Sequence, residues 1–133
     1  MKDVLLGIDQ SVERAVAQVN TVLELFDVDN IHVYLLHDFV ENPEGASVVQ
    51  VDSVKRAQEL LEDADIPVDL REGSGDPAES IIETSEAIDA DAICIAGRKR
   101  SPAGKMLFGS VSQSVILNTQ RPVLLCSPSD DEE

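Results

Sequence analysis

The chain of 133 residues contains no tryptophan, one tyrosine and three phenylalanines, so that aromatic residues make up only 3% of it. Such a chain must build its core from Val, Ile, Leu and Ala. No stretch approaches the roughly 20 consecutive apolar residues of a membrane-spanning helix, so no membrane segment is predicted. The N-terminus runs directly into a strand-like segment without signal-peptide architecture, and we therefore expect a cytoplasmic location.

Basic residues are also scarce. Ten Lys and Arg stand against 26 Asp and Glu, which gives a net charge of −16 and a pI near 4.2. This field repels nucleic acid and anionic membranes, so neither is expected as a general partner. Because 43% of the residues are hydrophobic, the chain is not a disordered acidic polymer. The length predicts one domain over residues 1–128 and an acidic flexible tail over 129–133.

Acidic residues are absent from residues 92–129, although this segment contains five basic residues. Four of the five fall within residues 98–105, namely Arg98, Lys99, Arg100 and Lys105. A local basic loop in an acidic chain indicates an anion site. The alternative is an exposed loop whose basic side chains pair with acidic neighbours, and charge alone does not decide between the two.

Strand-like and helix-like segments alternate along the chain. Short apolar runs predict five strands, at residues 4–8, 31–36, 67–70, 92–96 and 122–126. Helical spacing of apolar residues predicts four intervening helices, at residues 12–26, 51–64, 77–88 and 110–117. Asp9 or Ser11 is placed to cap the first helix, and Asp76 to cap the third. This order predicts an α/β fold with a single doubly wound parallel sheet and helices on both faces.

Ligands of such sheets bind beyond the carboxyl ends of the strands, where the strand order reverses. Asp9 ends the first strand and is the best acidic candidate there, either as a hydrogen-bond acceptor for a ribose or base or as a helix cap. His37 ends the second strand, where a satisfied structural histidine is favoured over a catalytic base. No Cys or His cluster has metal-ligand spacing, and no Ser/His/Asp set emerges from the sequence.

The glycines that follow the fourth strand suggest phosphate binding. The segment from Gly97 to Lys105 leads to Gly109 and Ser110, where a helix begins, and a helix N-terminus favours an anion. The spacing is not that of a P-loop, because six residues separate Gly97 from Gly104 and no Ser or Thr follows Lys105. The alternative is that Gly104 and Gly109 only shape a turn and cap the helix.

The two cysteines, Cys94 and Cys126, both lie in apolar runs that are predicted strands. Neither belongs to a C-x-x-C motif, so reduced core thiols are favoured over a redox pair. A chain of this length needs no disulfide or metal to fold.

Taken in order, these segments resemble the universal stress protein (UspA-like) family over nearly the whole chain. The resemblance rests on Asp9 and Ser11, Leu35-Leu36-His37, Gly75-Asp76-Pro77-Ala78-Glu79, Asp91 to Gly97, Gly109-Ser110-Val111, and Arg121-Pro122-Val123. It implies an adenine-nucleotide α-hydrolase-like fold, a five-stranded parallel sheet in the order 3-2-1-4-5. It also implies a homodimer formed through the fifth strand, Pro122 to Cys126. Some members of the family bind ATP and others do not.

The ATP-binding members share the motif G-x2-G-x9-G-[ST], whose last pair falls on Gly109-Ser110 and would hold phosphate. Counting back without gaps places the earlier glycines at Ala96 and Lys99. One inserted residue moves them to Gly97 and Arg100, so the second glycine is missing in either case.

Other residues could compensate for the missing glycine. Gly104 could supply a bend in the backbone, and Lys99, Arg100 or Lys105 could bind phosphate by charge. The resemblance also implies that Asp9 approaches the nucleotide. The backbone of Asp38, where members often carry valine, would pair with adenine. The implied nucleotide site comprises Asp9, Asp38, Gly97, Arg98, Lys99, Arg100, Gly104, Gly109 and Ser110, and Mg²⁺ could accompany ATP.

The sequence therefore predicts a dimeric stress-response module that binds ATP or another adenine nucleotide between the first and fourth strands. The alternative is a regulatory or scaffolding dimer of the same fold that binds no nucleotide and uses the altered loop for a protein contact. An enzyme of the related α-hydrolase class is least favoured, because no catalytic base or metal set is found. At most, slow ATP hydrolysis is expected.

The acidity also suggests a halophilic source, because a strongly hydrated carboxylate surface keeps a protein soluble in concentrated salt. Only four lysines occur beside 26 acidic residues. We expect the midpoint of thermal or denaturant unfolding to rise continuously from low to molar KCl. Screening of the net charge is largely complete at a few tenths molar, where the Debye length is already about 5 Å. A midpoint that stays flat would contradict the halophilic hypothesis, and one that rises only to that point would indicate screening alone.

Overall fold

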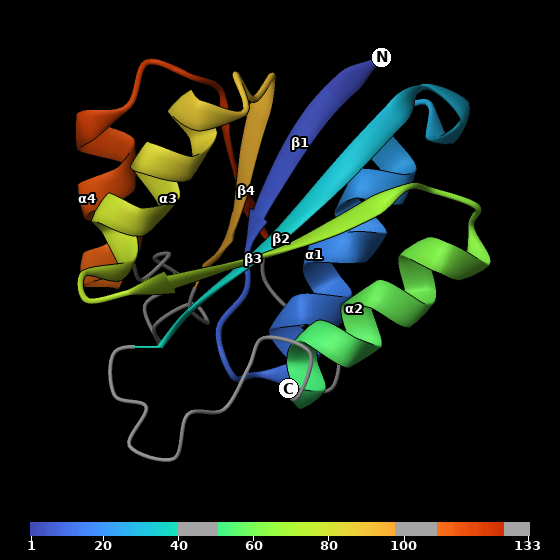
Figure 1. Cartoon of the computed structure of the whole chain (residues 1–133), viewed down its shortest axis with the longest axis horizontal. Helices are drawn as coiled ribbons and strands as arrows, with labels where there is room; N and C mark the ends of the chain where they lie inside the picture. The colour runs from blue at the N-terminus through green and yellow to red at the C-terminus, as the bar shows by residue number, and fades with distance from the viewer. Residues whose placement is uncertain (40–50, 98–108, 127–133) are drawn as a thin grey trace, which may run out of the picture.

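Five short apolar segments form one parallel sheet (Figure 1). The structure is a computed structural model, and it describes residues 1–39, 51–97 and 109–126. The strands are β1 (Lys2–Gly7), β2 (Ile31–Phe39), β3 (Val68–Ser74), β4 (Ala92–Ala96) and β5 (Val123–Cys126). They pair in parallel in the order β3-β2-β1-β4-β5. This confirms the fold class and the strand order that the resemblance implied.

The helices are α1 (Val12–Leu25), α2 (Asp52–Asp63), α3 (Pro77–Ala87) and α4 (Ser110–Asn118), and a short 3-10 turn, η1 (Val28–Asn30), precedes β2. Helices α1 and α2 cover one face of the sheet, and α3 and α4 cover the other (Figure 1). Alternate residues of each strand point to opposite faces, so the core has two halves. In β1, Val4 and Leu6 pack toward α1 and α2, whereas Leu5 packs toward α3 and α4.

The first and third helices begin at side-chain caps. Ser11, not Asp9, caps α1, because its Oγ accepts a hydrogen bond from the backbone amide of Arg14 at 3.2 Å. Asp76 caps α3 as predicted, since its carboxylate accepts from the amide of Ala78 at 3.0 Å, and Pro77 follows it. The carboxylate of Asp9 is therefore not the cap of α1.

Gln18 joins the two central strands from the inside of the fold. Its side chain on α1 is completely buried, and its Nε2 donates to the carbonyl of Gly7 at 2.9 Å and to that of Cys94 at 3.1 Å. The paired register of β1 and β4 ends at Leu6 and Cys94. Gln18 therefore bridges these strands at their carboxyl ends, where the strand order reverses.

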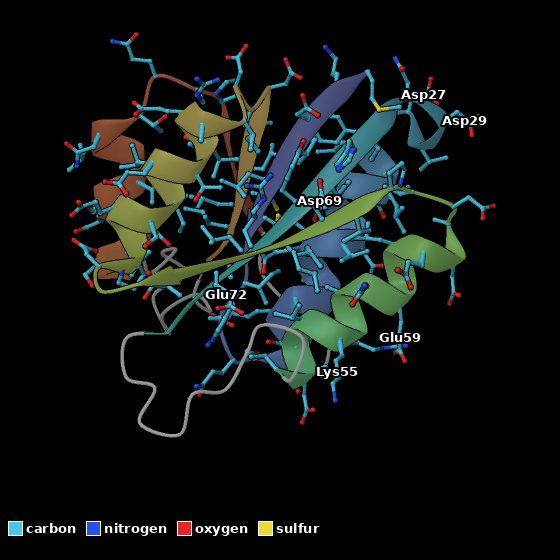
Figure 2. All side chains as sticks on the ribbon, viewed as in Figure 1. Asp27, Asp29, Lys55, Glu59, Asp69 and Glu72 are labelled. Carbon is cyan, nitrogen blue, oxygen red and sulfur yellow. The ribbon has the colours of Figure 1, made fainter. Side chains whose placement is uncertain are left out.

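The surface carries the acidity that the composition predicted. Asp27, Asp29, Glu59, Asp69 and Glu72 are all exposed and point away from the core (Figure 2). Over residues 1–39, 51–97 and 109–126, no helix has the length and apolar character needed to cross a membrane. The predicted acidic tail at 129–133 lies outside the described residues.

Candidate functional site

A cavity of about 640 Å³ opens at the carboxyl ends of β1, β2 and β4. It is bounded on one side by the first turns of α3 and α4. Five residues of the predicted site line it, namely Asp9, Asp38, Gly97, Gly109 and Ser110. The other four predicted residues, Arg98, Lys99, Arg100 and Gly104, lie outside the described residues.

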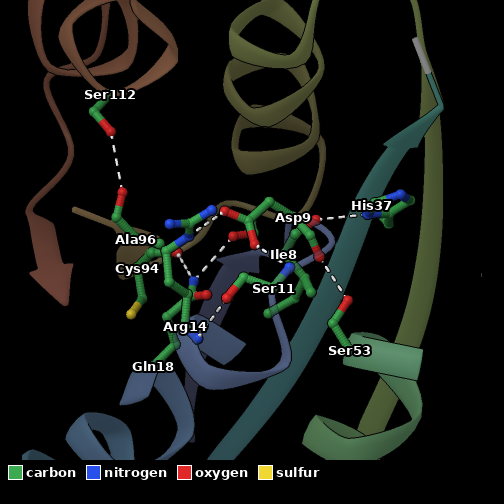
Figure 3. A network of polar contacts seen from close by, with 11 residues as sticks. Ile8, Asp9, Ser11, Arg14, Gln18, His37, Ser53, Cys94, Ala96 and Ser112 are labelled. Atoms are coloured by element: carbon green, nitrogen blue, oxygen red, sulfur yellow. Dashed lines mark hydrogen bonds and ion pairs between the residues drawn. The ribbon is translucent and has the colours of Figure 1, made fainter. Parts of the chain in front are cut away.

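Asp9 holds the turn between β1 and α1 and fixes a cation at the cavity (Figure 3). Its Oδ1 accepts from the amide of Ser11 at 2.8 Å, and its Oδ2 accepts from Nε of Arg14 at 2.8 Å. Both side chains remain about two-fifths exposed, so the pair keeps its contact with solvent. The carboxylate and guanidinium thus face the cavity as a neutral pair rather than as an isolated negative charge.

His37 supports this turn from β2 and is buried. Its Nδ1 donates to the carbonyl of Ile8 at 2.7 Å, since a carbonyl can only accept. From α2, the Ser53 hydroxyl donates to the carbonyl of Asp9 at 2.5 Å (Figure 3). These contacts agree with the structural interpretation of His37, because its ring fixes the backbone that carries Asp9.

At the end of the cavity away from β2, the wall is formed by the start of α4. Gly109 is the N-cap with an extended backbone, and it has no side chain that could cap the helix. The first amide groups of a helix have no partner within the helix, so they can bind an anion. Ser112 anchors this turn by donating from Oγ to the carbonyl of Ala96 at 3.2 Å (Figure 3).

Asp38 lies at the β2 end of the cavity and is fixed by α3. The Ser80 hydroxyl donates to its Oδ2 at 2.5 Å. The other oxygen, Oδ1, is buried from solvent and has no hydrogen-bond partner among residues 1–39, 51–97 and 109–126. The cavity therefore has a carboxylate held in place by Ser80 at β2 and the amide groups of the first turn of α4 at its other end.

Several lining residues were missed at the sequence level. Arg14, Ser112, Pro77 and Ile81 all line the cavity. Arg14 lies on the first turn of a predicted helix, five residues after Asp9, and that spacing is the one local signal for the ion pair. In the part of the chain that the structure describes, no group of three or more His, Cys, Asp or Glu side chains could hold a metal ion.

The two thiols lie side by side behind the cavity. The sulfur atoms of Cys94 and Cys126 are 3.0 Å apart and buried, and both thiols are free. The hydrogen bond from Cys94 lowers the pKa of Cys126 to about 7, against the opposing effect of burial. That same bond, followed by burial, raises the pKa of Cys94 well above its ordinary value. These opposite directions predict that the pair shares one proton above about pH 7, with the negative charge on Cys126.

Comparison with known proteins agrees with this geometry. The model of the universal stress protein family matches residues 1–127. The chain belongs to this family. Universal stress proteins similar in sequence include one from Mycolicibacterium smegmatis, 36% identical over 69 residues, a match that covers 51% of this chain and 53% of that protein. Another, from Methanocaldococcus jannaschii, is 27% identical over 130 residues and covers 90% and 76% of the two chains.

Solved structures of universal stress proteins share the fold. The protein from Archaeoglobus fulgidus superposes with a TM-score of 0.77 at 24% identity, covering 95% of this chain and 98% of that one. A family member from Arabidopsis thaliana with AMP bound gives 0.75 at 16% identity, covering 99% and 95%. A universal stress protein in complex with cAMP gives 0.72 at 19% identity, covering 96% and 98%. With the Mycolicibacterium relative, the match spans about half the length of each protein.

The thiol pair predicts a titration near neutral pH. We expect one thiolate to form with a midpoint of about 7, as followed by ultraviolet absorbance of the native protein. Because the pKa of Cys126 is lower when folded than when unfolded, its thiolate adds stability as the pH rises from about 7, and the raised pKa of Cys94 opposes this above the ordinary thiol pKa of 9.0. The contribution of Cys126 is lost as the pH falls through about 7.

Two variants test the assignment. Cys126→Ala should abolish the near-neutral titration. Cys94→Ala removes the hydrogen-bond donor and should raise the pKa of Cys126, because burial then acts without its main opponent. An unchanged midpoint in Cys94→Ala would contradict the shared proton.

Proposed function

We propose that this universal stress protein binds an adenine nucleotide in the cavity at the ends of β1, β2 and β4. The observation that carries the proposal is the pairing of a cavity of about 640 Å³ with the uncapped N-terminus of α4. That volume lies within the range of about 300 to 1,000 Å³ usual for small-molecule sites. The phosphates would lie at Gly109 and Ser110, and the base toward β2.

Two further observations support a nucleotide as the ligand. Solved relatives of the same fold contain AMP in one case and cAMP in another. The Asp9–Arg14 pair limits the negative charge that a phosphate would meet in an otherwise acidic chain. Mg²⁺ bound to the phosphates would accompany ATP, and Arg98, Lys99, Arg100 and Lys105 would add positive charge from the adjoining segment.

The altered glycine motif favours a second candidate function. No glycine stands where the second glycine of the ATP motif is expected, because that position is Lys99 or Arg100. A side chain there hinders the close approach of backbone to phosphate. A regulatory or scaffolding dimer without nucleotide is the function that this departure supports.

A charge placed at the start of α4 separates the two functions. We expect denatured wild-type protein to release an adenine nucleotide, measured by mass spectrometry, and ATP with Mg²⁺ to raise its melting temperature. Ser110→Asp should weaken ATP, AMP and cAMP binding by at least about tenfold, because it places a carboxylate beside the phosphates. The helix itself should remain intact, since an acidic residue favours a helix N-terminus.

The matched control is Gln113→Glu, which adds the same charge to the exposed side of α4 outside the cavity. It should leave nucleotide affinity nearly unchanged. Absence of both released nucleotide and any thermal shift in the wild type would reject nucleotide binding and leave the scaffolding dimer.

We also propose that the cytoplasmic form is a homodimer that pairs through β5. Cell fractionation tests the cytoplasmic location. Strand β5 lies at the edge of the sheet. The carbonyls of Pro122 and Cys126 accept from Ile93 and Gly97 on the β4 side. Alternate residues face the other way, so the backbone of Val123 and Leu125 is directed to the free edge. An edge of this kind can pair with a second copy.

Proline at this edge tests the dimer. Leu125→Pro removes an outward amide donor and should convert the dimer to a monomer in light scattering after size exclusion. Leu125→Ala shortens the side chain but keeps the amide, so it should remain dimeric. A wild-type protein that is monomeric at micromolar concentration, or a Leu125→Pro variant that stays dimeric, would contradict pairing through β5.

A further inference from the structure

The two cysteine side chains form a pair across neighbouring strands. Cys94 on β4 and Cys126 on β5 both face α1 and α2, and their sulfur atoms lie 3.0 Å apart. Both thiols are free, as the sequence favoured. A disulfide bond is about 2.05 Å long, so the two sulfur atoms are within about 1 Å of bonding distance. The missing C-x-x-C spacing does not matter here, because the pairing of two strands brings the thiols together.

The surroundings of this pair favour a reactive thiol at Cys126. The hydrogen bond from Cys94 is the main cause that lowers the pKa of Cys126 to about 7, and the side chain of Thr21 on α1 acts in the same direction. On the other side, the amide of Gln18 donates to the carbonyl of Cys94 at 3.1 Å and holds that residue in place. Since the thiolate is the nucleophilic form of cysteine, Cys126 is the better nucleophile of the two.

Cys126 is also the thiol nearer to solvent. It is 4% exposed, whereas Cys94 has no exposed surface. Because so little of Cys126 is accessible and the chain has a net charge of −16, a reagent that reaches it must be small and uncharged. Hydrogen peroxide and small organic hydroperoxides meet both conditions.

We propose that Cys94 and Cys126 are a site of reversible oxidation, at which a small hydroperoxide converts the two thiols into a disulfide between β4 and β5. The sulfur of Cys126 attacks hydrogen peroxide, so that an S–O bond forms, the O–O bond breaks, and the departing hydroxide takes the Cys126 proton as water. The sulfur of Cys94 then attacks that of Cys126. The S–S bond forms, the S–O bond breaks, and hydroxide leaves with the Cys94 proton as a second water. The thiols lose two electrons, and the peroxide gains them.

The strand register explains why this disulfide would be reversible. Cys94 pairs with Leu124 and Cys126 pairs with Ala96, so the two cysteines are diagonal neighbours. With strands about 4.8 Å apart and about 3.3 Å per residue, diagonal Cα atoms lie near or beyond the span of about 4.4–6.8 Å that a disulfide bridges. Closing the bond must therefore draw the short edge strand β5 toward Cys94. A disulfide formed in this way retains strain, and strained disulfides are readily reduced.

Peroxide treatment of the native wild-type protein tests the proposal. We expect a small molar excess of hydrogen peroxide to remove both free thiols and to leave a chain lighter by two hydrogen atoms, as measured by thiol titration and intact-mass spectrometry. Digestion without reduction should yield a peptide pair that joins Cys94 to Cys126. Dithiothreitol should restore both thiols.

Two matched variants separate the steps. Cys94→Ser keeps the attacking sulfur and lacks the second one, so Cys126 should gain oxygen, trapped as a sulfenic acid with dimedone, and form no internal disulfide. Cys126→Ser leaves only the completely buried Cys94, which should react at least about tenfold more slowly.

Three results would overturn the proposal. One is a folded wild-type protein that keeps both thiols in peroxide, and another is one that gains oxygen without the bond between Cys94 and Cys126. The third is a disulfide that forms only between chains or only after unfolding in urea. The wild-type measurements decide these outcomes even if a serine variant folds poorly, and none of them depends on nucleotide binding.

Discussion

The amide of Gln18 is the contact on which the shape of the cavity depends. In a doubly wound sheet, the connections that follow two neighbouring strands run to opposite sides at the point where the strand order reverses. The chain therefore separates at the carboxyl ends of these strands, here β1 and β4. That separation creates the cleft and also leaves backbone carbonyls to be satisfied inside the fold. One side-chain nitrogen donates to the carbonyls of Gly7 and Cys94 together and so joins β1 and β4 where the cleft begins. The residues from Gly7 to Asp9 and from Ile95 to Gly97 line the cavity at the ends of these two strands.

The cavity differs in character from the surface around it. The chain as a whole has a charge of −16, yet Asp9 is neutralised by Arg14 at the mouth of the site, and α4 offers amide donors at one end. Asp38 is held by the Ser80 hydroxyl and lies on the other side of β1 from α4. The site therefore has one end suited to an anion in a chain that is otherwise strongly acidic.

Most of the fold was predictable from local pattern, and the site was predictable only in part. The bounds of β4 were predicted at 92–96 because a fully buried strand is a continuous apolar run. The predicted third strand ended at residue 70, whereas β3 continues to Ser74, because its polar second half is held by pairing with β2 rather than by its own hydrophobicity. The 3-10 turn before β2 was also missed, since three residues carry no periodic signal.

The roles of site residues depended on distant partners. Asp9 had two possible roles in the sequence, and the choice was made by Arg14 and by the cap at Ser11. Asp38 was included in the predicted site only because of the family resemblance, and only for its backbone. The orientation of its side chain is set by a hydrogen bond from Ser80, which lies 42 residues later on another element. No spacing rule in the sequence predicts that contact. Local patterns fix which residues reach the ends of the strands, but contacts between elements fix what they do there.

Gly73 limits which substitutions the protein can accept at this position and at its neighbours. Any larger residue there meets both Ser80 and the Asp38 carboxylate, although position 73 does not line the cavity itself. A Cβ at position 73 would also lie 2.8 Å from the Cβ of Ser80, so shortening either neighbouring side chain alone does not make room for it. Three residues on three elements, β2, β3 and α3, are therefore expected to vary together, because a change at one of them alters the room left for the other two.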